Sequence, residues 1–280
     1  MYIGFHFSIQ PSLAHVPINV HEFGCNTFQL FTRSNRQWNA KPLDTELAAK
    51  FRQNYTDLKF ETSVIHLPYL PNFATSDPVI REKSLKSLHE EVFRANLLEI
   101  PNIVLHLGSH KEEGDEAGIK NMVAALDDVI PELDKTRLSL EISAGHPNSV
   151  GKNFEELHTI LEKVSDDKKI GICMDTAHAF AANYDLRTPE TVESVFESFD
   201  NIIGLNKLYT VHLNDSKKEI GSHLDRHEHI GKGKIGQVGF KAILKRLNPL
   251  AIPVIMETPK SEKYGDNENL AMVHTLLEDN

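Results

Sequence analysis

Six short apolar runs in this chain each end on a residue that can bind a metal. They span residues 64–66, 103–106, 138–141, 170–175, 209–212 and 253–257, and they end on His66, His106, Glu141, Asp175, His212 and Glu257. Such runs are typical of parallel strands that are buried on both faces. In a (β/α)8 barrel the ends of all strands point into one mouth, which carries the active site. The pattern therefore predicts an α/β fold, a (β/α)8 TIM barrel, with a cluster of His, Glu and Asp at its mouth.

The rest of the chain alternates between expected strands and helices, as a (β/α)8 barrel requires. Two further strands are expected near residues 2–7 and 27–31. Helix start signals stand between strands, where Asp77 precedes Pro78 and Thr188 precedes Pro189. Residues 217–239 are rich in glycine and predict a long loop after the seventh strand. With 280 residues and no linker or low-complexity segment, we expect one barrel domain over residues 1–280.

The composition is typical of a soluble globular protein. Hydrophobic residues make up 40% and charged residues 25%, and no long apolar run predicts a membrane span. The N-terminal residues resemble a strand and not a signal peptide. Of the two cysteines, Cys25 and Cys173, the second lies inside an expected buried strand. A disulfide is not expected, and we therefore expect an intracellular, cytoplasmic location.

The net charge of −10 argues against a broad basic groove, and taken alone it lowers the expectation of DNA binding. Four of the acids are themselves candidate metal ligands, namely Glu141, Asp175, Asp225 and Glu257. About three divalent ions would bring the balance to roughly −4, with all of the added charge at the mouth. The composition is therefore compatible with a phosphate substrate.

The candidate ligands favour a catalytic metal site. His178 follows Asp175 by three residues, and Asp225 and His227 stand two apart on the expected loop. His and carboxylate ligands suit zinc, manganese or iron, whereas structural zinc sites are commonly rich in Cys. Any one of these residues alone could be a polar residue at the barrel rim. All nine at one mouth would repel one another or lack partners without cations, so we expect two or three metals.

Seven motifs follow one another along nearly the whole chain: residues 31–38 (FTRSNRQW), 106–110 (HLGSH), 175–182 (DTAHAFAA), 184–189 (YDLRTP), 212–215 (HLND), 225–227 (DRH) and 256–258 (MET). Each motif alone is a weak signal, but their order and spacing together are specific. The sequence resembles the endonuclease IV family, apurinic/apyrimidinic endonucleases that fold as (β/α)8 barrels and hold three zinc ions.

The resemblance assigns all nine candidate ligands to three zinc ions. The first would be held by His66, His106 and Glu141, the second by Glu141, Asp175, His212 and Glu257, and the third by His178, Asp225 and His227. Manganese or iron could take the place of zinc at some of these positions. Glu141, Asp175 and Glu257 are thereby the expected catalytic residues.

The resemblance also implies a reaction. The family hydrolyses the phosphodiester 5′ to an abasic site in double-stranded DNA, which leaves a 3′-hydroxyl and a 5′-deoxyribose phosphate, and it trims blocked 3′ ends. Close divalent metals can generate hydroxide from water at neutral pH and neutralise phosphate charge. We therefore expect a DNA-repair hydrolase that needs no protein nucleophile, acts as a monomer and has no membrane partner.

Two loops are expected to contact DNA by the same resemblance. Arg36, after the second strand, could fill the space left by the missing base. Tyr69 and Leu70, after the third strand, could wedge against bases. Packing of Tyr69 over the barrel rim is an equally good interpretation of that residue.

Two positions depart from the family pattern. Ile142 follows Glu141 where Asn is common, and the missing amide could weaken the support of neighbouring ligands. Lys232 stands where Glu is common and could contact a phosphate. Neither change removes a candidate ligand, so they bear on rate and substrate preference more than on the class of reaction.

Other functions remain open on the sequence. A sugar isomerase or epimerase on the same barrel would need one or two metals, and the third ligand set argues against it. A non-catalytic DNA-binding metalloprotein would not need an open site of several metals, and a purely structural metal protein is disfavoured by the ligand types. His6, His110 and His229 could each touch substrate near the mouth or be structural.

Overall fold

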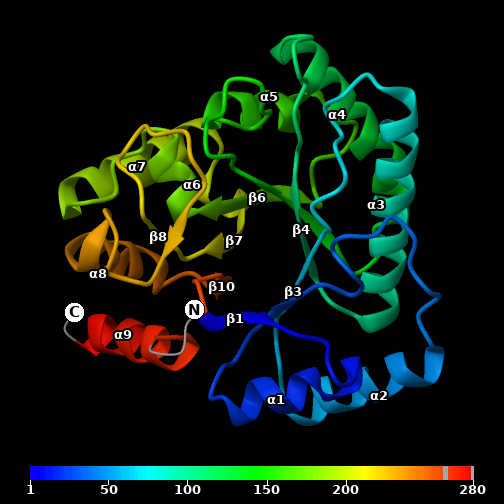
Figure 1. Ribbon diagram of the computed structural model, residues 1–280, viewed down its shortest axis with the longest axis horizontal. Helices are drawn as coiled ribbons and strands as arrows, with labels where there is room; N and C mark the ends of the chain where they lie inside the picture. Colours follow the sequence, from blue (N-terminus) through cyan, green and yellow to red (C-terminus); the bar gives the residue numbers. More distant parts are fainter. Residues whose placement is uncertain (261–263, 279–280) are drawn as a thin grey trace.

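A computed structural model describes residues 1–260 and 264–278 of the chain (Figure 1). Eight strands, each parallel to its neighbours, close into a barrel in the order β1-β10-β7-β6-β5-β4-β3-β2. They are β1 (Tyr2–Phe7), β2 (Gln29–Leu30), β3 (Val64–His66), β4 (Asn102–His106), β5 (Arg137–Glu141), β6 (Ile170–Asp175), β7 (Leu208–His212) and β10 (Pro253–Met256). The predicted TIM barrel is confirmed, and the six apolar runs form six of its strands.

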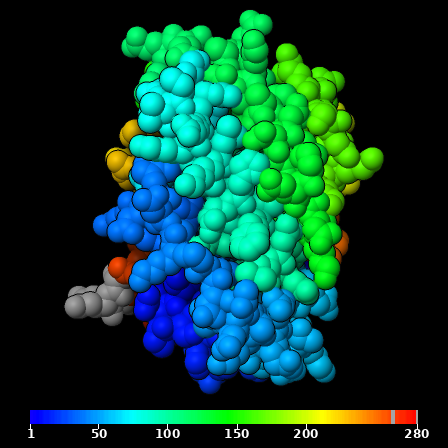
Figure 2. Space-filling view, turned by 90° about the vertical axis from the view of Figure 1, so that its right-hand side faces the viewer, coloured from blue at the N-terminus to red at the C-terminus, as the bar shows by residue number. Residues whose placement is uncertain are grey.

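The helices lie around the outside of the strands (Figure 1). They are α1 (Val16–Glu22), α2 (Thr45–Asp57), α3 (Pro78–Leu98), α4 (Asp115–Val129), α5 (Phe154–Lys163), α6 (Thr176–Ala181), α7 (Pro189–Ile202), α8 (Gly236–Leu247) and α9 (Asp266–Glu278), with short 3-10 turns η1 (Leu13–His15), η2 (Ile130–Glu132) and η3 (Leu205–Lys207). Figure 2 shows the side of the molecule on which α3 and α4 cover the barrel. Among the described residues, no helix combines the length and the apolar character needed to cross a membrane.

Both predicted helix start signals are confirmed. The Asp77 carboxylate accepts hydrogen bonds from the backbone N–H groups of Val79 and Ile80, and Pro78 opens α3. Thr188 begins α7 in the same way, through a reciprocal pair of hydrogen bonds with Thr191. These caps satisfy backbone N–H groups that have no partner inside the helix.

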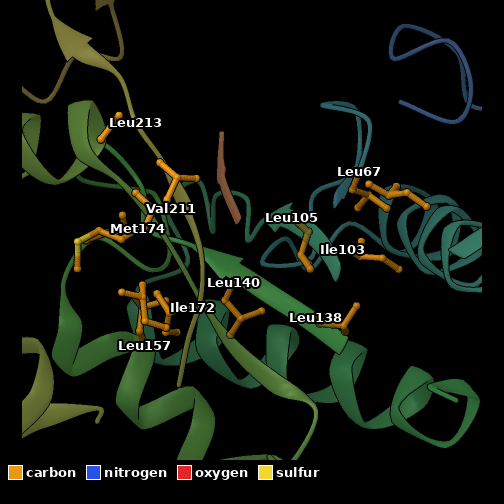
Figure 3. Close-up of a cluster of buried hydrophobic side chains, with 14 of the residues drawn as sticks. Leu67, Ile103, Leu105, Leu138, Leu140, Leu157, Ile172, Met174, Val211 and Leu213 are labelled. Carbon is orange, nitrogen blue, oxygen red and sulfur yellow. The ribbon is translucent and has the colours of Figure 1, made fainter. Parts of the chain in front are cut away.

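Outward-facing side chains of the strands form the main core of the protein (Figure 3). Ile103 and Leu105 of β4 and Leu138 and Leu140 of β5 belong to one buried cluster that also contains Leu157 of α5. This cluster fills the space between the strands and the surrounding helices. Burial of such side chains is the main stabilising contribution in a barrel of this kind.

Inward-facing side chains alternate with the outward-facing ones and lead to the mouth of the barrel. Val64, Val104, Cys173 and Ile255, from four strands, form a separate buried cluster. Two positions further along the same segments stand His66, His106, Asp175 and Glu257. Because side chains two apart on a strand point the same way, an apolar layer inside the barrel supports a polar layer above it.

The segment 217–239, which was predicted as a long loop, is only partly irregular. Within it, β9 (His227–Glu228) pairs antiparallel with β8 (Asp215–Ser216), which directly precedes the segment, and α8 already begins at Gly236. The buried Asp215 carboxylate accepts hydrogen bonds from the N–H groups of Gly233 and Ile235 at 2.8 and 3.0 Å. A Cβ at Gly233 would lie 2.4 Å from the Ser216 carbonyl oxygen, so the chain can approach only as glycine. These long-range contacts order the segment, and local sequence patterns could not reveal them.

Candidate metal centre

Glu141, at the end of β5, is almost completely buried in the middle of the polar layer. Its Oε2 lies 3.2 Å from Nε2 of His66 and 3.5 Å from Nδ1 of His106, at the ends of β3 and β4. One donor atom from each of these residues lies within 4.8 Å of the other two, close enough to surround one cation. They are the three residues that the family resemblance assigns to the first metal.

A second group faces the other carboxylate oxygen of Glu141. Its Oε1 lies 3.0 Å from Nδ1 of His212, and Oε2 of Glu257 lies 3.3 Å from the same nitrogen. Oδ2 of Asp175 lies 3.9 Å from that nitrogen, and the four residues again offer donors within 4.8 Å of one another. With one oxygen toward each group, Glu141 has the geometry of a bridging carboxylate.

The third predicted set joins His178 of α6 to Asp225, which lies between β8 and β9, and to His227, the first residue of β9. The Asp225 carboxylate lies 3.3 Å from Nε2 of His178 and 3.2 Å from Nε2 of His227. Asp175 also approaches Nε2 of His227, at 3.5 Å. Both Nε2 atoms are buried and have no hydrogen-bond partner within the described ranges. Because an unpaired buried polar atom is costly, nitrogens that face carboxylates in this way fit a bound cation.

The crowding of imidazole and carboxylate groups sets the charge of the site. Burial raises the pKa of Glu141, but His106 and His212 outweigh this effect and hold the pKa well below its ordinary value. For His227 burial has the opposite effect and lowers the pKa, because it disfavours the charged imidazolium. The carboxylates of Asp175 and Asp225 outweigh burial and raise the pKa of His227 to about 9. The carboxylates therefore favour positive charge beside them at neutral pH. Protons on the histidines and divalent cations compete to supply that charge.

Backbone carbonyl groups orient three of the histidines. Nδ1 of His66, His178 and His227 donates to the carbonyl oxygens of Leu67, Ile142 and Glu257 at 2.7, 3.0 and 3.2 Å. Each of these rings thereby presents Nε2 to the site. The departure at Ile142 does not remove this support, because His178 bonds to the main chain of Ile142 and the side chain of Ile142 is fully buried in the core.

Two amide side chains hold the acids, and neither was identified as a site residue from the sequence. Asn214 donates to Oδ2 of Asp175 at 2.7 Å and accepts from the backbone N–H of Glu257 at 2.8 Å. Gln29 donates to Oε1 of Glu257 at 2.6 Å. Asn214 could have been found, since it stands two positions after His212 in a recognised motif. Gln29 could not, because β2 is two residues long and too short to show alternation.

Cys173 also lies close to the donors of Glu141 and His212. Burial raises the pKa of its thiol to about 12, so it is protonated at neutral pH. It packs with Val64 and Ile255 inside the barrel, and the prediction of a buried core residue is confirmed.

The three histidines that the sequence left open separate into two kinds. His6 lies at the mouth, with Nδ1 3.8 Å from Oε1 of Glu257. His110 instead bonds to Asp115 at 3.0 Å, and His229 bonds to Asn269 at 3.1 Å. His6 is therefore part of the site, whereas the other two hold neighbouring segments together.

The three expected DNA contacts differ in exposure. Arg36 is exposed, Tyr69 is 56% exposed and Leu70 is partly buried. The Tyr69 ring packs 5.4 Å from the ring of His66 and 5.7 Å from that of His106, so the residue covers the rim and is exposed at the same time. Tyr69 lines two hollows of about 550 and 480 Å³, which reach Glu257 and Glu141 respectively.

Lys232, the other departure from the family pattern, lies on the exposed turn before α8. Its ammonium group lies 3.4 Å above the ring of Tyr264, a cation–π contact.

The residues present fit divalent metal ions. The donor groups mix imidazole nitrogen with carboxylate oxygen, a combination that suits zinc, manganese and iron. The side chains of His106 and Asp225 are 33% and 55% exposed, so the cluster is not closed on its outer side. Open coordination positions of this kind distinguish catalytic from structural sites.

Comparison with known proteins shows the family to which the chain belongs. A family model described as a xylose isomerase-like TIM barrel matches residues 18–275. A probable endonuclease 4 of Methanoculleus marisnigri is 44% identical over 98% of this chain and 98% of its own length. One of Nitrosopumilus maritimus is 42% identical over 96% and 98%. The chain belongs to the endonuclease 4 family.

Solved structures agree with the endonuclease 4 assignment. Endonuclease IV from Thermus thermophilus matches with a TM-score of 0.88 and 31% identity, and 100% of both chains is covered. A D-tagatose 3-epimerase-like protein matches with a TM-score of 0.74 over 99% and 96% of the two chains. At 19% identity, the epimerase-like protein shares the fold alone. The family resemblance expected from the motifs is confirmed.

Proposed function

We propose that this endonuclease 4 family member is a metal-dependent DNA-repair endonuclease that hydrolyses the phosphodiester 5′ to abasic sites. The products are a 3′-hydroxyl and a 5′-deoxyribose phosphate, and the same site trims blocked 3′ ends. The observation that carries the proposal is the position of Glu141, whose two oxygens face two groups of donors, beside a third group made by Asp175, His178 and His227. A site for several cations at an open barrel mouth suits a polyanionic substrate.

Three zinc ions are the proposed cofactors, with manganese or iron at some of the positions. The proposed ligands are the nine residues His66, His106, Glu141, Asp175, His178, His212, Asp225, His227 and Glu257. When bound, such ions lower the pKa of water and neutralise charge on phosphate oxygens. Glu141, Asp175 and Glu257 act in catalysis by holding the ions at fixed positions. Neighbouring histidines keep the pKa of the Glu141 carboxylate low, so it stays ionised in this role.

The chain's own side chains are proposed to recognise the lesion. Arg36 is exposed on the loop after β2 and is available to enter the space of the missing base. Tyr69 and Leu70 are proposed to wedge against bases, and the Tyr69 ring at the same time packs 5.4 Å from the ring of His66. An abasic nucleotide lacks base stacking, so its rotation toward the metals costs less than that of a normal nucleotide.

The proposed partner is double-stranded DNA that contains abasic sites or blocked 3′ ends, and the protein is proposed to act as a monomer in the cytoplasm. Both cysteines are unpaired and buried, which agrees with a reducing compartment. Size-exclusion chromatography with light scattering tests the oligomeric state directly.

The test is cleavage of a duplex that carries one stable abasic-site analogue, followed by analysis of the product ends. The zinc-loaded protein should nick the strand 5′ to the lesion and leave a 3′-hydroxyl, and it should leave the matched intact duplex uncut. Chelator-treated protein should not cut either duplex. If the metal-loaded protein does not nick the lesion strand, the proposal is wrong, and interconversion of ketose sugars becomes the next assay.

A further inference from the structure

Gln29 makes three contacts within the proposed metal centre. Its side chain is fully buried on β2. The amide nitrogen lies 2.6 Å from Oε1 of Glu257 and 3.1 Å from Nδ1 of His6, and the amide oxygen lies 2.8 Å from Nε2 of His212. The residue therefore bridges two of the proposed ligands without being a proposed ligand itself.

The chemistry of the partners fixes the orientation of this amide. An ionised carboxylate only accepts hydrogen bonds, so the group that faces Glu257 must be the NH2 of Gln29. The carbonyl oxygen of Gln29 then faces His212, and because that oxygen only accepts, Nε2 of His212 must carry a hydrogen. Nδ1 of His212 faces the carboxylates of Glu141 and Glu257 at 3.0 and 3.3 Å, so it must carry a hydrogen or bind a cation there. Because Gln29 holds Nε2, Nδ1 is the nitrogen of His212 that can bind a metal in place of that hydrogen.

His212 thus differs from three other histidines of the site. His66, His178 and His227 donate from Nδ1 to main-chain carbonyl oxygens and present Nε2. His212 presents Nδ1, and its second nitrogen bonds to a side chain. A main-chain partner survives any substitution, whereas the partner of His212 does not.

We infer that Gln29 is a positioning residue that selects Nδ1 of His212 and Oε2 of Glu257 as the metal-binding atoms of the second donor group. The inference rests on the proposed metal centre. Gln29 binds Oε1 of Glu257 and so leaves Oε2, which lies 3.3 Å from Nδ1 of His212, for the metal. One amide thereby orients two ligands that come from β7 and from the end of β10.

Two substitutions separate the contacts. Gln29→Met keeps the length of the side chain but removes both the donor to Glu257 and the acceptor for His212. Gln29→Glu keeps an oxygen for His212 and replaces the donor to Glu257 with a second carboxylate. Gln53→Met, on the exposed face of α2, is the matched control, because Gln53 bonds only to Asp57 among the described residues.

The measurement is the release of zinc from the loaded protein to a chromophoric chelator, with the number of ions counted and thermal unfolding of the metal-free variants recorded. Loss of an outer hydrogen-bond partner weakens metal binding about 10- to 100-fold. We expect both Gln29 variants to bind one ion about 10- to 100-fold more weakly than the wild type does. The other ions should be released as in the wild type, and Gln53→Met should release all ions as the wild type does.

Nitrogen-15 NMR of histidine-labelled protein gives a second readout that a general loss of stability would not mimic. The Nε2–H form of His212 should be lost in Gln29→Met and kept in Gln29→Glu. Unchanged release of every ion, or equal weakening of all of them, would overturn the inference. Wild-type protein that binds no zinc would instead overturn the metal centre of the proposed function.

Discussion

Arg33 and Glu91 form a buried ion pair that ties the loop after β2 to the middle of α3. Glu91 is fully buried and also accepts a hydrogen bond from the hydroxyl of Thr32. Arg33 donates further to the Trp38 carbonyl oxygen at 2.8 Å. Both ends of the short segment that presents Arg36 are therefore held from inside the molecule, while Arg36 itself stays exposed.

Glu91→Ala should destabilise the protein strongly, because it leaves the Arg33 guanidinium buried without its carboxylate. Breaking one partner of a buried pair typically costs about 3–5 kcal/mol of the free energy of unfolding. The control is Glu162→Ala, which removes an exposed carboxylate paired with the exposed His158 on α5 and should cost about 1 kcal/mol or less. Urea unfolding of both variants measures the difference, and equal values for the two would contradict the role given to the buried pair.

Glu257→Gln should keep the fold and the binding of lesion-containing duplex but lose most cleavage. Glu257 lies 3.3 Å from Nδ1 of His212 and belongs to the second donor group, which a neutral amide would bind less well. We expect the rate of nicking to fall by more than about 100-fold, beyond the usual effect of an outer partner. Rates under single-turnover conditions and binding by fluorescence anisotropy separate the two properties.

The control for Glu257→Gln is Glu219→Gln, which removes an exposed carboxylate paired with Lys234. It should cleave at the wild-type rate. Wild-type cleavage by Glu257→Gln as well would show that Glu257 does not act in the reaction.

His89 should make stability depend on pH on the outer surface, away from the mouth. Partial burial lowers the pKa of His89, but the carboxylates of Glu132 and Asp128, at 2.9 and 2.8 Å, outweigh it, and the pKa is raised above 6.5. A raised folded-state pKa stabilises the protein fully below the unfolded value, and this stabilisation is lost as pH rises through the folded value.

The melting temperatures of wild type and His89→Gln should therefore differ more at about pH 6 than at about pH 8.5. The comparison is made with the chelator-treated protein, so that metal loss does not contribute. A double variant, Asp128→Asn with Glu132→Gln, should likewise show a melting temperature that depends less on pH than that of the wild type. A difference that grows with pH would have the wrong sign for this ion pair.

Much of the barrel could be predicted because its strands are marked at their ends. A run such as 170–175 is apolar until Asp175, and this transition gives both the strand and the direction of its mouth. Glu141 and its neighbours were found in the same way, as one polar residue at the end of each run. The spacing of His178 after Asp175, and of Asp225 and His227 on the expected loop, then supplied the remaining candidate ligands.

The remaining features depend on contacts between distant parts of the chain. The hydrogen bond between Gln29 and Glu257 joins residues that are 228 positions apart, and no local pattern marks it. Asp215 orders the following segment by accepting hydrogen bonds from the backbone N–H groups of Gly233 and Ile235. Every residue except proline has such a group, so the sequence does not mark these partners. At Ile142 the sequence shows only the side chain, whereas the contact with His178 is made by the main-chain carbonyl group.

Tyr69→Ala should weaken binding of the lesion duplex while leaving the metals in place. The ring is 56% exposed and lines both hollows, so it is available to stack on a base. Stacking on an aromatic side chain contributes about 1–3 kcal/mol per base, and we expect a loss of affinity of about 10-fold or more.

Tyr69→Phe keeps the ring and should bind nearly as the wild type does. Because His66 is oriented by the Leu67 carbonyl and not by Tyr69, zinc content should be unchanged in both variants. If Tyr69→Ala loses zinc in proportion to its loss of affinity for the lesion duplex, the ring supports His66 and does not contact DNA.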